Sequence, residues 1–446
     1  MKIEQFYDEA LAHAAYALIS EGEMALIDPG RDPQQYYDYA QAHQARIVAV
    51  LETHPHADFV SAHLEIHQST GAEIYVHPLL GASYPHTPLE DGDTVKIGAV
   101  EIRALHTPGH SPDSNSYLLL DAAGKPHSLF TGDTLFVGDV GRPDLREHVG
   151  NVQAKASELA YQLYQSTREK IMPLDPLVRI YPAHGPGSLC GRNIRPDLHS
   201  TIGRELAENY ALQDMSADDF VALITAEQAW IPGYFAYNVA LNRKGAKAFK
   251  ASIASVKRLN NETDLEPSVL CIDTRNASAF RAGHIPGSLN IPENNKFETW
   301  LGAVVAPEEA FYLLGTSEEK LMELMERVAK IGYEGQVKGI LWNFQGTGQL
   351  PEFNPEVFQD NPDAFQLLDV RNAGEVKAGK IFPDALSIPL YELRKRLKEI
   401  PLNKPIVVHC AGGLRSGIAS SILAAFLPNI QIWDMGTHIQ TYTKKS

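Results

Sequence analysis

A dense cluster of residues of the kind that bind metals comes directly after an apolar segment, and it limits the folds that this chain can adopt. His54, His56 and Asp58 fall within five positions, and the branched, apolar run at 46–51 comes just before them. Such a run is typical of a buried strand, so the cluster is expected where the strand opens into a loop. Two imidazoles and a carboxylate at this density are hard to explain without a metal.

Three later segments repeat the arrangement of an apolar strand followed by ligand-type residues. They end in T-P-G-H at His110, in T-G-D at Asp133 and in P-A-H-G at His184. Side chains at the ends of several strands of a sheet can converge on one point. The sequence therefore predicts that these loops share one site.

The four motifs, H-x-H-x-D, T-P-G-H, T-G-D and P-A-H-G, resemble those of the metallo-β-lactamase superfamily in order and spacing. The resemblance implies an α/β protein that begins with an αββα sandwich, whose strand-end loops hold one or two metals. Two-metal members carry a second histidine directly after the aspartate, where this chain has Phe59. A phenyl ring cannot ligate, so a site built from Asp58, residue 59 and His184 would lack a ligand. A two-metal hydrolase is therefore not expected.

Length and charge narrow the classes of partner. The chain has 446 residues, enough for two to four domains. With 39 basic and 55 acidic residues the formal charge is 39 − 55 = −16, which argues against nucleic acid or an anionic membrane as partner. The sequence shows no signal peptide and no membrane-spanning segment, so a cytoplasmic protein is expected. Three scattered cysteines predict free thiols.

The second half of the chain contains an internal repeat. Asp273-Thr274-Arg275 is followed by the segment A-G-H-I-P-G, and about a hundred residues later Asp369-Val370-Arg371 is followed by A-G-K-I-F-P. Both copies resemble the rhodanese domain, in which a D-x-R strand end precedes the catalytic strand. The predicted domains are 1–250, a metallo-β-lactamase-like domain, 262–345, a first rhodanese copy, and 354–446, a second rhodanese copy.

The two copies differ where the chemistry is expected. In the second copy an apolar strand ends in a C-x4-R loop, which consists of Cys410, Ala411, Gly412, Gly413, Leu414 and Arg415. The glycines allow backbone N–H groups to point at the sulfur, and with Arg415 and the helix dipole these should stabilise a thiolate or a persulfide anion. A phosphatase could use the same loop, but the D-x-R element favours rhodanese. The first copy has no cysteine at the equivalent position and is predicted to be catalytically empty.

This domain order resembles the fused persulfide dioxygenase and sulfurtransferase enzymes of bacteria. The resemblance implies one Fe(II) per chain, held by His54, His110 and Asp133 as the facial triad of oxygen-activating iron. The implied reaction uses O₂ to oxidise the outer sulfur of a low-molecular-weight thiol persulfide to sulfite, with release of the thiol. Sulfur transfer to or from thiosulfate would run through Cys410.

Further residues are assigned roles around these centres. His56, Asp58 and His184 are expected to surround the metal ligands. The G-R-x-D segment with Arg142 and Asp144 is similar to one that lies near the iron in persulfide dioxygenases. Cys190, in G-S-L-C-G, resembles a cysteine assigned to sulfane sulfur in the fusion enzymes, and Arg192 is a candidate for binding an anionic thiol. A buried structural thiol and a surface arginine are the alternatives for the last two.

Two other functions stay open at this point. A thiolester hydrolase of the glyoxalase II type, with a zinc-bound hydroxide, would need only one metal. A sulfur carrier built on Cys410 would leave the metal motifs unexplained. We expect a homo-oligomer that acts on a thiol persulfide, O₂, thiosulfate and sulfite. The sequence does not identify the thiol, which could be glutathione, coenzyme A or bacillithiol, nor the direction of sulfur flow.

Overall fold

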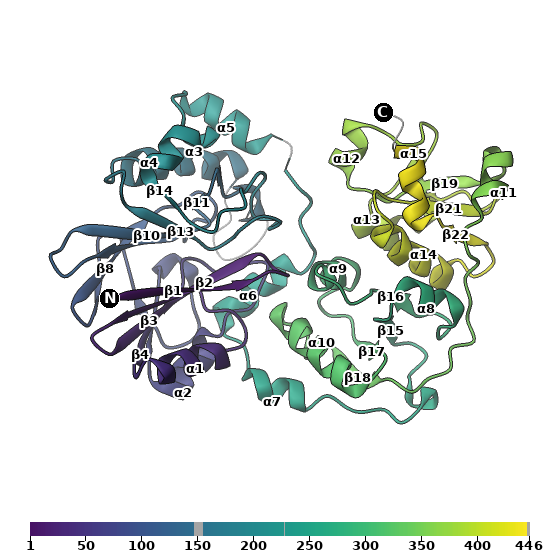
Figure 1. Ribbon diagram of the computed structural model, residues 1–446, viewed down its shortest axis with the longest axis horizontal. Coiled ribbons are helices and arrows are strands. Elements are labelled where there is room, and N and C mark those ends of the chain that lie inside the picture. The colour runs from purple at the N-terminus through teal and green to yellow at the C-terminus, as the bar shows by residue number, and fades with distance from the viewer. Residues whose placement is uncertain (147–154, 227, 444–446) are drawn as a thin grey trace. The chain divides into compact units, whose positions relative to one another are not determined.

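Two six-stranded sheets and two four-stranded sheets form the framework of the protein (Figure 1). The computed structural model describes residues 1–146, 155–226 and 228–443. It divides into a first unit of Met1–Ser252 with Ala329–Gly332, and a second unit of Ile253–Val328 with Tyr333–Ser446. Apart from Ala329–Gly332, both repeat copies fall in the second unit, so this division leaves the predicted boundary between them untested. In the part of the chain described, no helix combines the length and apolar character needed to cross a membrane.

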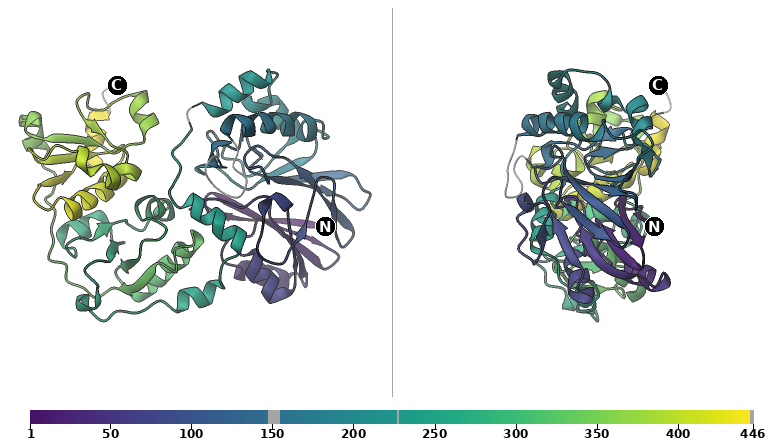
Figure 2. Two further views of the ribbon diagram at one scale, coloured as in Figure 1. Left: turned by 180° about the vertical axis from the view of Figure 1, so that it is seen from behind. Right: turned by 90° about the vertical axis from the view of Figure 1, so that its left-hand side faces the viewer.

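Helices α1 (Gln34–Ala42) and α2 (His63–Thr70) pack on the outer face of the first sheet of the first unit (Figures 1 and 2). In β2, Ala14 and Tyr16 point into the core shared with the second sheet, whereas Ala15 and Ala17 pack toward the helices. This alternation follows from the two-residue period of a strand that is buried on both faces. The elements, in chain order, are β1 (Lys2–Asp8), β2 (His13–Ser20), β3 (Glu23–Ile27), α1 (Gln34–Ala42), β4 (Arg46–Leu51), α2 (His63–Thr70), β5 (Glu73–Val76) and β6 (Thr87–Pro88).

The second sheet, in the order β14-β13-β10-β9-β8-β7, packs its inner face on the first. Its outer face packs on α3, α4 and α5 through a separate apolar cluster that includes Leu163, Ile202 and Phe220. The strands are β7 (Thr94–Ile97), β8 (Val100–His106), β9 (Asn115–Leu120), β10 (Pro126–Gly132), β13 (Arg179–Pro182) and β14 (Ser200–Thr201), with a small separate pair, β11 (Leu135–Phe136) and β12 (Asp139–Val140). The helices are α3 (Ala156–Ser166), α4 (Ile202–Glu208), α5 (Ala217–Thr225), α6 (Phe235–Lys244) and α7 (Phe249–Ala254). The predicted αββα sandwich is confirmed.

Each repeat copy forms a parallel four-stranded sheet, with the matching orders β16-β15-β17-β18 and β20-β19-β21-β22. The first copy comprises β15 (Leu270–Asp273), α8 (Ala277–Ala282), β16 (Leu289–Asn290), α9 (Phe297–Val304), β17 (Phe311–Leu314), α10 (Glu318–Lys330) and β18 (Val337–Leu341). The second comprises α11 (Pro355–Asp360), β19 (Gln366–Asp369), α12 (Ala373–Ala378), β20 (Leu386–Ser387), α13 (Leu390–Arg396), β21 (Ile406–His409), α14 (Leu414–Phe426), β22 (Ile432–Asp434) and α15 (Gln440–Thr443). The expected pair of α/β domains is confirmed.

The D-x-R motif has the same structural role in both copies. In the second copy the Arg371 guanidinium donates to both oxygens of Asp369 at 2.7–3.0 Å and to the Gly379 carbonyl at 3.0 Å. In the first copy Arg275 binds Asp273 and the Gly283 carbonyl in the same way. The motif therefore fixes a strand end to the turn after the next helix and carries no catalytic information by itself.

Replacing Arg371 should destabilise the second copy. The Asp369 side chain is 1% exposed, so Arg371→Met leaves a buried carboxylate without its cation, and we expect the free energy of unfolding to fall by roughly 3 kcal/mol. Hydrogen exchange of peptides from β19 and β21 measures this loss directly. Arg396→Met breaks pairs at the surface, with side chains about one-third exposed or more, and should cost less than about 1 kcal/mol. Equal effects of the two changes would contradict this assignment.

Candidate metal centre

The loops that carry the four sequence motifs meet at one end of the sandwich. His54 follows β4, His110 lies between β8 and β9, Asp133 follows β10 and His184 follows β13. Parallel pairing of β10 with β13 sets Gly132 opposite Pro182, which brings the loops with Asp133 and His184 together. The Asn115 N–H donates to the Thr53 carbonyl at 2.8 Å and joins the β4 loop to the second sheet. The prediction of one shared site therefore matches the arrangement of the loops.

His54, His110 and Asp133 direct one donor atom each toward a common point. The Asp133 Oδ2 atom lies 3.7 Å from Nε2 of His54 and 3.4 Å from Nε2 of His110. All three residues are buried, and their ligand atoms lie within 4.8 Å of one another. Asp133 Oδ2 is buried without a hydrogen-bond partner in the structure. A buried carboxylate oxygen without a partner is unfavourable unless a cation binds it, so this donor set fits a metal ion.

Hydrogen bonds behind both histidines fix the tautomer that a metal needs. The Thr53 hydroxyl donates to Asp28 Oδ2 at 2.8 Å, so it accepts from Nδ1–H of His54, which lies 3.0 Å away. In His110, Nδ1–H donates to the Arg142 carbonyl at 2.9 Å. Each imidazole thus turns the lone pair of Nε2 toward Asp133, which is the usual role of groups outside a metal's ligands.

The charge states suit a cation. Burial, followed by the nearby His56, lowers the pKa of His54 well below its usual range, and burial likewise lowers the pKa of His110. Both ligands are therefore neutral at pH 7. Burial opposes ionisation of Asp133, but His184 and His110 outweigh it and hold the pKa of that carboxyl well below its usual range. The donor set carries one negative charge.

His184 lies between two carboxylates and occupies the other oxygen of Asp133. Its Nδ1 is 2.7 Å from Asp133 Oδ1, and its Nε2 is 2.8 Å from Asp58 Oδ2. Burial disfavours the imidazolium, yet Asp133 and Asp58 together raise the pKa of His184 well above its usual range. The imidazolium holds Asp133 so that Oδ2 stays free for a metal. His184 and Asp58 were predicted around the metal ligands, and both lie there.

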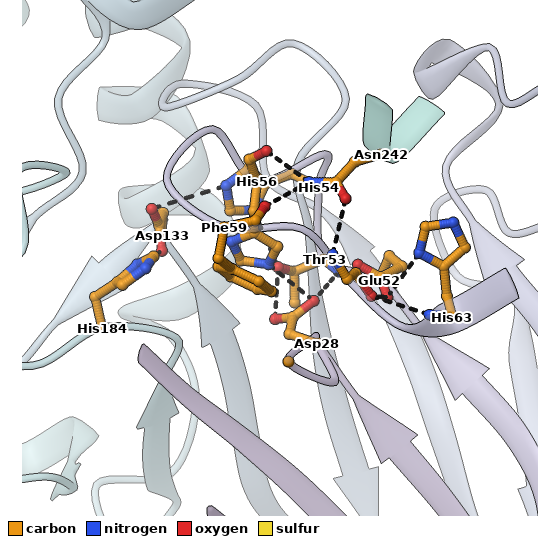
Figure 3. A network of polar contacts seen from close by, with 12 residues as sticks. Asp28, Glu52, Thr53, His54, His56, Phe59, His63, Asp133, His184 and Asn242 are labelled. Atoms are coloured by element: carbon orange, nitrogen blue, oxygen red, sulfur yellow. Dashed lines mark hydrogen bonds and ion pairs between the residues drawn. The ribbon is translucent and has the colours of Figure 1, made fainter. Parts of the chain in front are cut away.

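Phe59 lies beside His56 in the motif loop, at the position where the two-metal members that the sequence resembles carry a histidine (Figure 3). Its ring is 1% exposed and packs between the imidazoles of His13 and His56, with ring centres 3.7 and 4.4 Å away. His56 Nε2 lies 3.2 Å from Asp28 Oδ1, and one ring nitrogen of His56 also lies within 4.8 Å of ligand atoms of Asp133 and His184. Phe59 thus places an apolar ring, and no donor, beside these histidines.

Three supporting residues were not identified in the sequence. The Asn242 amide donates to the carbonyls of His56 and Phe59 at 2.8 Å each and accepts the Ser61 N–H at 2.9 Å, so it fixes the loop (Figure 3). Asn242 is far away in sequence on α6, and no local pattern marks it. Asp28 follows β3 in an Asp-Pro-Gly segment that suggests only a turn, and His13 lies within a strand. Only the fold places the three beside the motif loop.

The remaining predicted residues are held by protein groups. Arg142 donates to both oxygens of Asp144 and to the carbonyls of Leu189 and Ala229. Its own carbonyl orients His110, so its support of the metal site comes from the backbone. The Arg192 guanidinium donates to the Leu223 and Ala226 carbonyls. A role for Arg192 in binding a thiol stays a prediction.

Cys190 lies within the site but as a buried thiol. Its sulfur is within 4.8 Å of ligand atoms of Asp58 and His184. Burial, and then the charges of Asp58 and Asp133, raise the pKa of the Cys190 thiol well above its usual value. A protonated thiol is a weak nucleophile, which favours a structural role in the free protein. Sulfur handling by Cys190 stays a prediction.

The Cys410 loop lies in the second unit, between β21 and α14. The Gly413 N–H donates to the Cys410 sulfur at 3.1 Å, and Gly413 adopts a φ of +102°, which favours glycine. The Arg415 guanidinium binds the Glu375 carboxylate of α12, at 2.8 Å for the longer contact. Ala411 and Gly412 are exposed at the loop tip, and Leu414 begins α14. The Gly413 N–H therefore points at the sulfur, and a catalytic role of this loop stays a prediction.

The equivalent strand of the first copy, β17, ends without a cysteine. Cys271 lies on the neighbouring strand β15, and burial raises the pKa of this thiol to about 11. In the described residues of this copy, no thiol other than Cys271 is present.

Both halves of the chain match known protein families. Residues 9–184 match the family model described as metallo-beta-lactamase superfamily, and 253–338 and 354–441 match the rhodanese-like domain. A probable metallo-hydrolase of Burkholderia pseudomallei is 33% identical over 269 residues, covering 51% of this chain and 87% of the relative. A hydroxyacylglutathione hydrolase of Arabidopsis thaliana is 35% identical over 132 residues, 29% of this chain and 51% of that relative. A crystal structure described as a metallo-beta-lactamase from Staphylococcus aureus is 31% identical, with a TM-score of 0.70, covering 77% of this chain and 99% of that one.

Phe59→His should create a second metal site beside the first. The new imidazole would join Asp58 and His184, and a ring without a donor would be lost. Metal analysis after dialysis against Co(II) should show an increase of about one ion per chain over the parent protein, since three converging donors suffice for a site. Phe59→Leu is the matched control and should bind as much as the parent. Equal metal content in all three proteins would contradict the interpretation that Phe59 takes the place of a donor for a second metal.

Proposed function

Because this chain belongs to the metallo-β-lactamase superfamily and continues into two rhodanese-like domains, we propose that it is a persulfide dioxygenase joined to a sulfurtransferase. The observation that carries the proposal is the convergence of His54, His110 and Asp133 on one point, while Phe59 stands where two-metal members carry a histidine. Two histidines and one carboxylate with free positions are typical of non-haem Fe(II) oxygenases. Fe(II) bound by these residues would supply the activation of O₂.

The overall reaction consumes a thiol persulfide, O₂ and water. R-S-S⁻, O₂ and H₂O give R-SH, sulfite and one proton, so that the outer sulfur is oxidised and O₂ takes up the electrons. The sulfur–sulfur bond breaks, and the inner sulfur leaves as the thiol. His54 and His110 contribute neutral donors and Asp133 a single negative charge, so that the site retains positive charge for an anionic persulfide once Fe(II) is bound.

The second site would transfer sulfur through Cys410. Its thiolate attacks the outer sulfur of thiosulfate, forms Cys-S-S⁻ and releases sulfite. A thiol then takes that sulfur and leaves as R-S-S⁻, which is the substrate of the iron site. The Gly413 N–H at 3.1 Å and the start of α14 both favour an anionic sulfur at this position. Thiosulfate, sulfite, O₂ and a low-molecular-weight thiol persulfide are the proposed partners.

A thiolester hydrolase is the second candidate. The match to the hydroxyacylglutathione hydrolase favours it, since that relative is 35% identical over 132 residues. In such an enzyme the same residues would hold zinc, and water would attack a carbonyl. The two-metal form is disfavoured by Phe59, and the rhodanese-like domains have no role in thiolester hydrolysis.

Metal content and oxygen consumption test the first half of the proposal. Protein purified without oxygen should hold about one iron per chain, the number that a single facial triad binds. It should consume O₂ when a thiol persulfide is added, and not with the thiol alone. Two tightly bound zinc ions, or no oxygen uptake by the iron-loaded protein, would contradict it.

Separate changes in the two sites should have separate effects. His110→Ala or Asp133→Ala should lower persulfide-dependent O₂ uptake by more than about a hundredfold, since groups behind metal ligands alone account for about 10- to 100-fold. Thiosulfate sulfurtransfer should stay close to that of the parent. Loss of both activities in a variant whose circular dichroism is unchanged would show that the activities do not belong to separate sites.

Replacement of Cys410 by serine tests the sulfur-transfer step. Cys410→Ser removes the nucleophile, so sulfurtransfer should be lost while oxidation of an added persulfide continues. Mass spectrometry of the parent after incubation with thiosulfate should show one added sulfur atom on the Cys410 peptide. Cys190→Ser is the control and should keep this adduct. An adduct on Cys190 that survives Cys410→Ser would move the carrier to the first domain.

A further inference from the structure

The helix that follows the Cys410 loop packs on the copy that has no cysteine. The Asn290 N–H of β16 donates to the Ser421 hydroxyl of α14 at 2.8 Å. A side chain at Gly417, also on α14, would meet the Asp434 carboxylate at 3.5 Å and the Ala277 side chain at 3.7 Å. Both copies lie in the same unit, so these contacts belong to one packed body. The empty copy is therefore in a position to influence the loop.

Asp434 is the residue at which the two copies meet behind the loop. It ends β22, and its Oδ1 accepts the Gly436 N–H at 2.9 Å. Its Oδ2 lies 3.5 Å from the guanidinium of Arg281, which is on α8 of the first copy. The Asp434 side chain is 5% exposed and that of Arg281 is 29% exposed. A buried carboxylate of the active copy thus has its cation in the empty copy.

A serine connects Asp434 to the reactive sulfur. Ser416, on the first turn of α14, lies near enough to Asp434 for its hydroxyl to lower the pKa of that carboxyl. The Ser416 Oγ atom lies 3.7 Å from the Cys410 sulfur and 3.0 Å from the Gly413 carbonyl. A hydroxyl has one proton to donate, so Asp434, Gly413 and an anionic sulfur compete for it. The charge on Asp434 decides how strongly it competes.

We propose that Arg281 of the cysteine-free copy is a positioning residue for sulfur transfer, because it compensates the charge of Asp434 and leaves the Ser416 hydroxyl free to donate to an anionic sulfur on Cys410. The first copy then completes the active site of the second. This inference rests on the proposed sulfur transfer for its biological meaning, but the contacts from Arg281 to Cys410 do not depend on it.

The charges around Asp434 support this role of Arg281. Burial raises the pKa of Asp434, while the Ser416 hydroxyl, the Gly436 N–H and the charge of Arg281 act in the opposite direction. Without Arg281, the carboxylate must either attract the serine proton more strongly or take up a proton itself. The negative charge of Asp434 also repels an anionic sulfur on Cys410. Arg415 and the Gly413 N–H also favour an anionic sulfur on Cys410.

The test compares the Cys410 reactivity of matched variants of the full chain. At neutral pH, Arg281→Gln should slow alkylation of Cys410 by iodoacetamide and the transfer of sulfur from thiosulfate to cyanide. The expected decrease in both rates is about three- to tenfold, the range typical of coupled neighbouring charges. Arg281→Lys should restore most of the rate, since it keeps the cation. Asp434→Asn in the Arg281→Gln background should also restore it, because the uncompensated charge is gone.

A different ion pair between the copies is the control for packing. Arg394 binds the carboxylate of Glu309 at 2.7 Å and the Val304 carbonyl at 2.8 Å, and so joins α13 to the first copy away from the loop. Arg394→Gln should leave both Cys410 rates within about twofold of the parent. Ser416→Ala should slow both rates, and adding Arg281→Gln to it should produce little further loss, because both act through the same hydroxyl.

The variants distinguish a positioning role of Arg281 from a general effect on the packing of the two copies. A rate loss in Arg281→Gln that neither Arg281→Lys nor Asp434→Asn restores would overturn the proposal, as would an equal loss in Arg394→Gln, since either would indicate general loosening of the copies. Unchanged rates in Arg281→Gln would also overturn it. If the parent lacks sulfurtransfer but the alkylation rates follow the expected order, the positioning role holds and the proposed function of Cys410 fails.

Discussion

The first domain depends on one carboxylate whose two oxygens serve different partners. Asp133 Oδ1 binds His184, and Oδ2 is left for the point shared with His54 and His110. Because His184 is also held by Asp58, the imidazolium has little freedom to turn and the orientation of Asp133 follows from it. A carboxylate with a single buried partner could rotate and lose the alignment. An ion-pair chain of protein groups thus holds the candidate metal site in place.

Much of this arrangement could be predicted from the sequence because its signals are local. Each metal-type residue lies within a few positions of a strand end, and the loop around Cys410 is contiguous. The sequence also shows that position 59 lacks a donor, and a single metal per chain stays a prediction. What it could not predict was contributed from a distance: Asn242 from α6, Asp28 from β3 and His13 from β2 reach the loop only in the folded chain. Hydrogen bonds between distant elements leave no periodic pattern in a single sequence.

The two repeat copies show how one fold can be kept while its chemistry is divided. Both retain the Asp–Arg pair that closes the strand end, because that pair is structural. Only the second has the cysteine loop, yet the first supplies Arg281 to the carboxylate behind it. A copy without the cysteine thus still contacts, through its surface, the copy that carries the Cys410 loop.

Reconstitution of the metal-free protein with iron or with zinc, followed by two assays on each form, distinguishes a persulfide dioxygenase from a thiolester hydrolase. One assay records O₂ uptake with a thiol persulfide, and the other records hydrolysis of a glutathione thiolester. We expect oxygen uptake by the iron form alone, with one sulfite released per O₂ consumed as the reaction balance requires. We expect no thiolester hydrolysis by either form. Thiolester hydrolysis by the zinc form, with no oxygen uptake by the iron form, would contradict the proposed dioxygenase function.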